Sequence, residues 1–136
     1  MTICLDSWAV LAWLDGEEPA ASAVQDAFDA QRPWMSWINV GEVAYQLERR
    51  HGPDEAAEVV RRLRAAVALD EASPERVLAA AHLKAGHPVA FADCFAAATA
   101  AARGATLLTG DPELLERDLG CRVRDLRAPA AARCGR

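Results

Sequence analysis

The chain has 136 residues, of which 52% are hydrophobic and 26% charged, and its formal net charge is −5. This length fits one domain, and the composition is typical of a folded globular protein and excludes a disordered one. No apolar run reaches the roughly 18 residues of a membrane span, and the first residues lack the basic stretch of a secretion signal, so we expect a cytoplasmic protein.

Short apolar runs alternate with helical signals along the chain. In the first half we expect a strand at 2–5, a helix at 7–14, a helix beginning at 17–19, a strand at 34–37, a helix at 39–51, a helix beginning at 53 and a strand at 67–69. In the second half we expect helices at 73–86, 93–103 and 112–117 and strands at 105–108 and 121–123. This alternation predicts an α/β fold with a central parallel sheet and helices on both faces. We expect the domain to span 1–126 and a flexible tail to follow at 127–136.

Four acidic residues lie where strands are expected to pass into helices. Asp6 and Asp111 follow apolar runs, Asp93 opens an almost wholly apolar helix, and Glu42 closes the capping-box pattern that Asn39 begins. The carboxyl ends of parallel strands line one crevice, so these acids can converge there, with the hydroxyls of Ser7 and Thr109 beside them.

Converging carboxylates repel one another, by roughly 4 kcal/mol for two charges about 4 Å apart at an effective dielectric of about 20. A cation must offset this repulsion, and an all-oxygen site favours Mg²⁺ or Mn²⁺. A purely structural interpretation also exists, because each acid is placed where it could cap or open a helix. Caps need not cluster, whereas metal ligands must.

The segments that carry these acids resemble those of PIN-domain ribonucleases, and in particular VapC-type toxins of toxin–antitoxin pairs. The matching segments are Leu5-Asp6-Ser7 with Leu11-Ala12, Ile38-Asn39 with Glu42-Val43, Ala92-Asp93 with Ala97 and Ala100, and Ala105 to Asp111 with Leu114. The resemblance covers the chain up to about Leu126. It implies a Rossmann-like sheet and an acidic pocket that binds one or two Mg²⁺ or Mn²⁺ ions.

The resemblance makes Asp6, Glu42, Asp93 and Asp111 the catalytic and metal-binding acids, supported by Ser7 and Thr109. Two departures from the family pattern concern their surroundings. Many relatives have a further acid or Asn after the fourth acid, and here only Glu113 can take that part. Relatives usually have a Ser shortly before the third acid, whereas this chain has His87 to Ala90.

We therefore expect a metal-dependent endoribonuclease that hydrolyses RNA phosphodiester bonds as the toxin of a type II toxin–antitoxin pair. The acids would position the metal, and one carboxylate would accept a proton from the attacking water. The expected partners are RNA, a cognate antitoxin and a second copy of the chain. Arg49 or Arg50 would contact RNA phosphates. Trp13 and Tyr45 belong either to the core or to a groove for an antitoxin helix.

Two alternatives remain open at this point. One is a catalytically inactive PIN-like scaffold that binds RNA or protein. The other is an aspartate-dependent phosphatase, which would also have Asp6 after its first strand. Such enzymes carry a second Asp two residues later, where this chain has Trp8.

Overall fold

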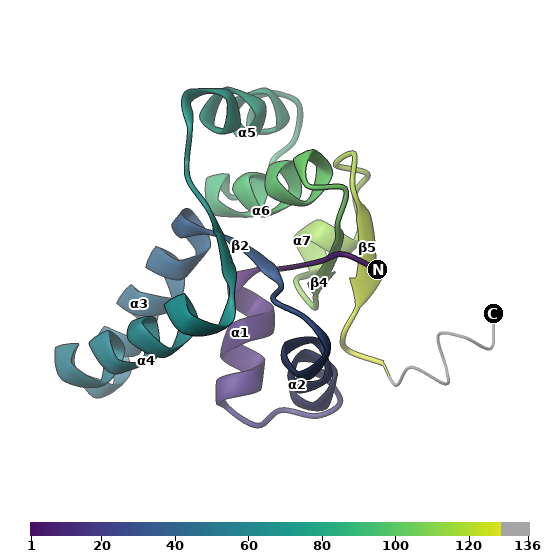
Figure 1. The fold of residues 1–136 in the computed structure, drawn as a ribbon. Helices are drawn as coiled ribbons and strands as arrows, with labels where there is room; N and C mark the ends of the chain where they lie inside the picture. Colours follow the sequence, from purple (N-terminus) through teal and green to yellow (C-terminus); the bar gives the residue numbers. More distant parts are fainter. Residues whose placement is uncertain (129–136) are drawn as a thin grey trace.

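The computed structural model describes residues 1–128, which form one five-stranded sheet with helices on both sides (Figure 1). The strands are β1 (Ile3–Leu5), β2 (Trp34–Ser36), β3 (Ala68–Asp70), β4 (Thr106–Thr109) and β5 (Arg122–Asp125). The helices are α1 (Ser7–Leu14), α2 (Ala20–Ala30), α3 (Trp37–His51), α4 (Pro53–Ala66), α5 (Pro74–Gly86), α6 (Phe91–Ala102) and α7 (Pro112–Leu115). The predicted α/β class is confirmed, while the predicted tail falls almost entirely outside the described residues.

All neighbouring strands are parallel, in the order β3-β2-β1-β4-β5. The chain runs outward from β1 through β2 to β3 and then returns to the other side of β1 to form β4 and β5. The strand order therefore reverses between β1 and β4. In open α/β sheets a crevice forms outside the carboxyl ends of the strands at such a reversal.

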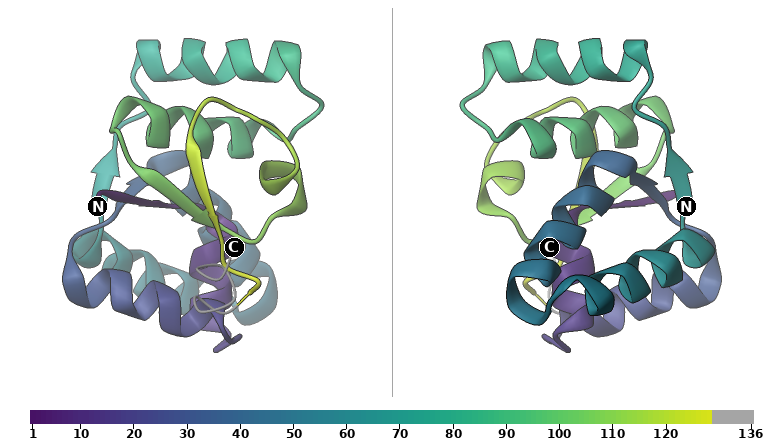
Figure 2. Two further views of the ribbon diagram at one scale, coloured as in Figure 1. Left: turned by 90° about the vertical axis from the view of Figure 1, so that its right-hand side faces the viewer. Right: turned by 90° about the vertical axis from the view of Figure 1, so that its left-hand side faces the viewer.

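Each face of the sheet buries its own core. Side chains alternate along a strand, so Leu5 packs with Met35 and Leu108 on one face while Cys4 packs with Leu107 on the other. Helices α1 to α4 cover the first face, and α6 covers the second with α5 lying over it (Figures 1 and 2). The run from Asp93 to Ala100 in α6 is buried, because α6 lies between the sheet and α5.

Two helices begin earlier than the sequence predicts. Helix α3 begins at Trp37, and Ser36 caps it by accepting a hydrogen bond from the backbone N–H of Ile38 at 3.1 Å. Helix α6 begins at Phe91 without a side-chain cap. The expectation that Glu42 and Asp93 mark strand-to-helix junctions is therefore wrong, since both lie inside helices.

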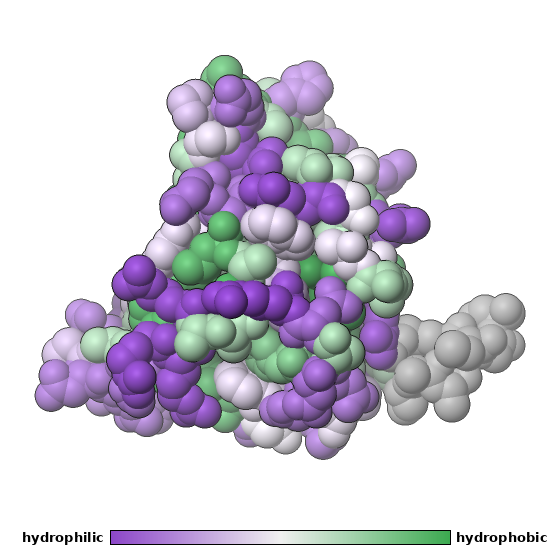
Figure 3. Space-filling view, in the orientation of Figure 1, coloured by the Kyte–Doolittle hydropathy of each residue, from purple (hydrophilic) through white to green (hydrophobic). Residues whose placement is uncertain are grey.

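The outer surface follows the helix patterns. Helix α4 buries Ala56, Val59 and Leu63 and turns its charged residues outward, which gives the hydrophilic area at the lower left of Figure 3. Trp13 is half-buried and packs edge-on against Phe28, with ring centroids 4.9 Å apart, so it belongs to the core. Within residues 1–128, no helix is both long and apolar enough to cross a membrane.

Candidate active site

Asp6 lies at the floor of the crevice between β1 and β4. It is the N-cap of α1, and its Oδ1 accepts a hydrogen bond from the backbone N–H of Ala9 at 2.8 Å. Its Oδ2 accepts one from the hydroxyl of Thr109, the last residue of β4. Burial raises the pKa of Asp6 to about 7; the two hydrogen bonds oppose this rise, and the charges of Asp111 and Glu42 add to it.

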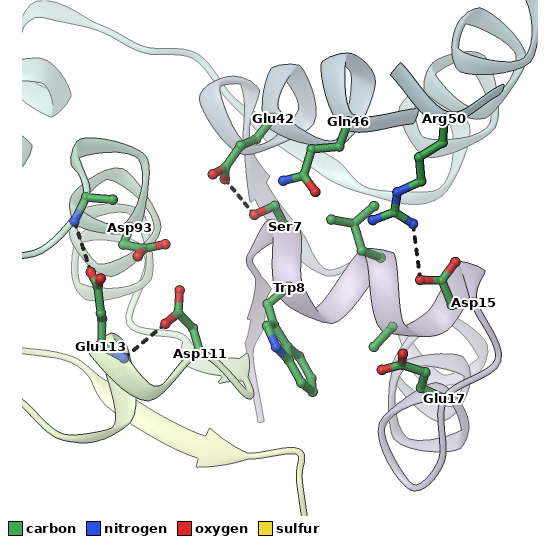
Figure 4. Close-up of a pocket in the computed structure, with 13 residues that line it drawn as sticks. Ser7, Trp8, Asp15, Glu17, Glu42, Gln46, Arg50, Asp93, Asp111 and Glu113 are labelled. Carbon is green, nitrogen blue, oxygen red and sulfur yellow. Dashed lines mark hydrogen bonds and ion pairs between the residues drawn. The ribbon is translucent and has the colours of Figure 1, made fainter. Parts of the chain in front are cut away.

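Asp111 and Asp93 approach the same place from the ends of other elements (Figure 4). Asp111 caps α7 as predicted: its Oδ1 accepts a hydrogen bond from the backbone N–H of Glu113 at 2.9 Å. Asp93 lies in the first turn of α6. Its pKa is raised to about 8, first by burial, then by the charge and hydrogen bond of Asp111, and then by the charges of Asp6 and Glu42.

Glu42 reaches the site from the middle of α3. Its Oε1 accepts a hydrogen bond from the hydroxyl of Ser7 at 2.5 Å and a longer one from Nδ2 of Asn39 at 3.5 Å. The same Asn39 amide donates to the carbonyl oxygen of Ala92, next to Asp93, at 3.1 Å. Asn39 therefore joins α3 to the start of α6 instead of capping α3, which corrects the capping-box prediction.

These residues surround a pocket of about 430 Å³. Three of the four predicted acids line it, while Asp6 is 1% exposed beneath it. Glu113 also lines the pocket, and its carboxylate accepts a hydrogen bond from the backbone N–H of Ala90, just before α6, at 3.2 Å. The remaining lining residues are Ser7, Trp8, Leu11, Ala12, Asp15, Glu17, Gln46, Arg50 and Ala90.

Gln46 and Trp8 are among the pocket residues that were not predicted as part of the site. Gln46 lies one helical turn after Glu42, and Arg50 lies one further turn along, so all three face the pocket from α3 (Figure 4). This spacing of four residues was a usable signal in the sequence. Trp8 offered no comparable signal, because its position depends on the packing of α1 against the end of β4.

The side chains fit a divalent metal in their chemistry. The acids supply oxygen ligands around one pocket, and such ligands suit Mg²⁺ or Mn²⁺. As the side chains stand, however, no three Asp, Glu, His or Cys residues among residues 1–128 form a group that could hold a metal ion. Binding one ion would therefore require these carboxylates to move closer together.

Comparisons with known proteins agree on the fold. No curated protein matches the chain. A DNA-bound VapBC structure from Salmonella typhimurium matches with a TM-score of 0.74 at 21% identity, covering 93% of this chain and 98% of that one. The sarcin-ricin loop cleaving toxin VapC20 from Mycobacterium tuberculosis matches with a TM-score of 0.70 at 16% identity, and the match covers 85% of this chain and 94% of that one.

A toxin–antitoxin complex from Klebsiella pneumoniae matches with a TM-score of 0.69 at 15% identity and covers 95% of this chain and 100% of that one. At these identities the likeness shows a common fold. The sequence model of the PIN domain family matches residues 3–118, which is most of the chain. The chain therefore belongs to the PIN domain family, as its sequence motifs had suggested.

Proposed function

We propose that this protein is a metal-dependent endoribonuclease and the toxin of a type II toxin–antitoxin pair. The observation that carries the proposal is that Glu42, Asp93 and Asp111, from three separate parts of the chain, line one pocket, with Asp6 buried beneath it. The charges of Asp111 and Glu42 raise the pKa of both Asp6 and Asp93. Folding by itself does not require a cluster of acids that raise one another's pKa. Membership of a family of nucleases supports the same conclusion.

The four acids would hold one or two Mg²⁺ or Mn²⁺ ions. A bound divalent ion supplies charge neutralisation at the phosphate and lowers the pKa of water. Thr109 fixes the orientation of Asp6, and Ser7 and Asn39 fix that of Glu42. One of the carboxylates accepts the proton of the attacking water, and Glu113 stabilises the start of α6 that carries Asp93.

The proposed partners are RNA, an antitoxin protein and a second copy of the chain in the cytoplasm. Solved complexes of the same fold with toxin–antitoxin descriptions support the antitoxin. Two exposed apolar side chains support self-association: Ile38 of α3 is 37% exposed and Phe91 of α6 is 44% exposed. Their chain neighbours Asn39 and Ala92 are joined by a hydrogen bond, so the two side chains belong to adjacent parts of the surface.

RNA cleavage by the purified protein tests the proposal. We expect cleavage with Mg²⁺ or Mn²⁺ and none with a chelator. Asp93→Asn and Asp6→Asn should each lower the rate at least about 100-fold, because each removes charge that holds the metal. Glu17→Gln, which changes an acid of the same pocket outside the cluster, should retain the rate. Full activity in both Asp variants would contradict the assignment.

The two alternative functions, an inactive scaffold and a phosphatase, predict different results with the same purified protein. An inactive scaffold would bind RNA without cutting it, with or without metal. A phosphatase would hydrolyse a small phosphate ester and leave RNA intact. Induced expression with and without a small reading frame encoded directly upstream tests the toxin role: growth arrest and discrete RNA fragments are expected only without the neighbour.

A further inference from the structure

A second, smaller hollow lies beside the acidic pocket on α3. It has a volume of about 280 Å³ and is lined by Tyr45, Gln46, Arg49 and Arg50. Gln46 and Arg50 line the acidic pocket as well. The two hollows are therefore neighbouring parts of one trough, with Glu42, Asp93 and Asp111 towards one end and Tyr45 and Arg49 towards the other. Asp15 and Glu17 also line the trough, and Asp15 pairs with Arg50.

Helix geometry explains this arrangement. Glu42, Gln46 and Arg50 repeat every four residues and face the acidic pocket, whereas Tyr45 and Arg49 form the adjacent row. From Glu42 to Arg49 the helix rises about 10 Å, at about 1.5 Å per residue. An RNA chain whose phosphate lies among the acids can therefore reach Tyr45 and Arg49 with a nearby nucleotide.

Tyr45 and Arg49 form an exposed stack. The guanidinium carbon of Arg49 lies 4.9 Å from the centroid of the Tyr45 ring, and Tyr45 is 48% exposed although the side chain is large and aromatic. Within residues 1–128, Arg49 makes no ion pair, whereas Arg50 lies 3.4 Å from the carboxylate of Asp15. Arg49 is therefore the more available cation for a phosphate.

We propose that Tyr45 and Arg49 form a nucleotide subsite, in which a base stacks on the Tyr45–Arg49 pair and its phosphate binds Arg49. Unpaired bases stack on aromatic rings and on guanidinium planes, and arginine binds phosphate. Charge complementarity favours RNA over a protein partner here: the chain carries a net charge of −5, yet this hollow contains two arginines and no acid. Gln46 lies between the subsite and the acids, where its amide can bond the intervening nucleotide. The inference rests on the proposed function for the identity of the ligand.

The test is RNA binding in the presence of a chelator, so that cleavage does not interfere. The probe is a fluorescein-labelled single-stranded oligoribonucleotide of mixed sequence, followed by fluorescence anisotropy at several salt concentrations. Tyr45→Ala should weaken binding about 10-fold, while Tyr45→Phe should retain it, because stacking needs the ring and not the hydroxyl. Arg49→Gln should weaken binding and reduce the slope of log affinity against log salt by about 0.7.

Arg64→Gln is the matched control. Arg64 also lies over an aromatic ring, with its guanidinium carbon 5.4 Å from the Trp37 ring centroid, but it lines neither hollow. This variant should bind RNA as the unaltered protein does. Thermal melting of every variant checks that the fold is retained, which we expect because Tyr45, Arg49 and Arg64 are exposed.

Wild-type affinity and salt slope in both Tyr45→Ala and Arg49→Gln would overturn the subsite, even if the protein cleaves RNA through its acids. Unchanged RNA binding together with loss of self-association on a sizing column would also overturn it and assign the surface to protein contact. Conversely, an RNA that binds through Tyr45 and Arg49 but is never cut would support the subsite and refute the proposed nuclease. The two proposals can thus fail separately.

Discussion

Gly110 lies between Thr109 and Asp111, two residues of the candidate site, and its backbone packs directly against the ring of Trp8. A Cβ atom at this position would overlap the ring carbons of Trp8. The backbone conformation of Gly110 is not of the left-handed kind, so the requirement for glycine is one of space. The absence of a side chain thus determines how closely α1 can approach the end of β4.

Replacing Gly110 by Ala should destabilise the protein by about 1–3 kcal/mol, because Trp8 must move out of its position. Urea unfolding measures this loss. Gly41→Ala is the control: it lies on the exposed side of α3 with nothing near its Cβ, and it should stabilise the helix by up to about 1 kcal/mol. Equal stability of Gly110→Ala and the unaltered protein would contradict the packing argument.

At the scale of elements, one buried carboxylate connects the edge strand β3 to helices α5 and α6 through hydrogen bonds. Both oxygens of Asp70, at the end of β3, accept hydrogen bonds: Arg76 of α5 donates at 2.8 and 3.1 Å, and Arg103 after α6 donates at 3.0 Å. Burial opposes the charged form, but the two arginines outweigh it and lower the pKa of Asp70. The side chain is 1% exposed.

Asp70→Ala should therefore cost about 3 kcal/mol or more in the free energy of unfolding, because it leaves two arginines without their shared partner. The control is Glu58→Gln on α4, whose ion pair with Arg61 is exposed to solvent and should contribute little to stability. Urea unfolding of both variants decides the matter. A loss at Asp70 no larger than that at Glu58 would show that the buried network adds little.

At the scale of the whole molecule, the acidic pocket makes stability depend on pH. The pKa values of Asp6 and Asp93 are raised in the folded protein to about 7 and about 8, from ordinary values near 4. The folded state therefore holds more protons than the unfolded state between about pH 4 and pH 8. Stability contributed by these groups is present at the acidic end of this range and is lost as the pH rises through it.

In a chelating buffer, the melting temperature should therefore fall by several degrees between pH 5 and pH 8. Asp93→Asn should flatten this decline and melt higher than the unaltered protein at pH 8, because it removes one repelling charge. Added Mg²⁺ should raise the melting temperature of the unaltered protein more than that of the variant, since an ion that binds only the native state stabilises it. Equal shifts would argue against a shared metal site.

Local patterns along the chain were sufficient for the fold class and for part of the site. Apolar runs and helix starts predict the α/β order, and Asp6 and Asp111 are caps as expected, because a cap depends on the few residues that follow it. The motifs also identified the PIN domain family correctly. Boundaries were less accurate: β4 and β5 begin at Thr106 and Arg122, each one residue after the predicted start.

Tertiary structure alone decided how the remaining residues meet. Asn39 and Ala92 are 53 positions apart in the sequence, and Asp70 and Arg103 are 33 positions apart, yet each pair is hydrogen-bonded. They meet because the chain returns from β3 to β4 and places α6 between the sheet and α5. No local pattern encodes such a contact. The amino-acid sequence by itself determined which carboxylates the protein carries and which elements hold them; the reversal of strand order beside β1 decided that these carboxylates share one pocket.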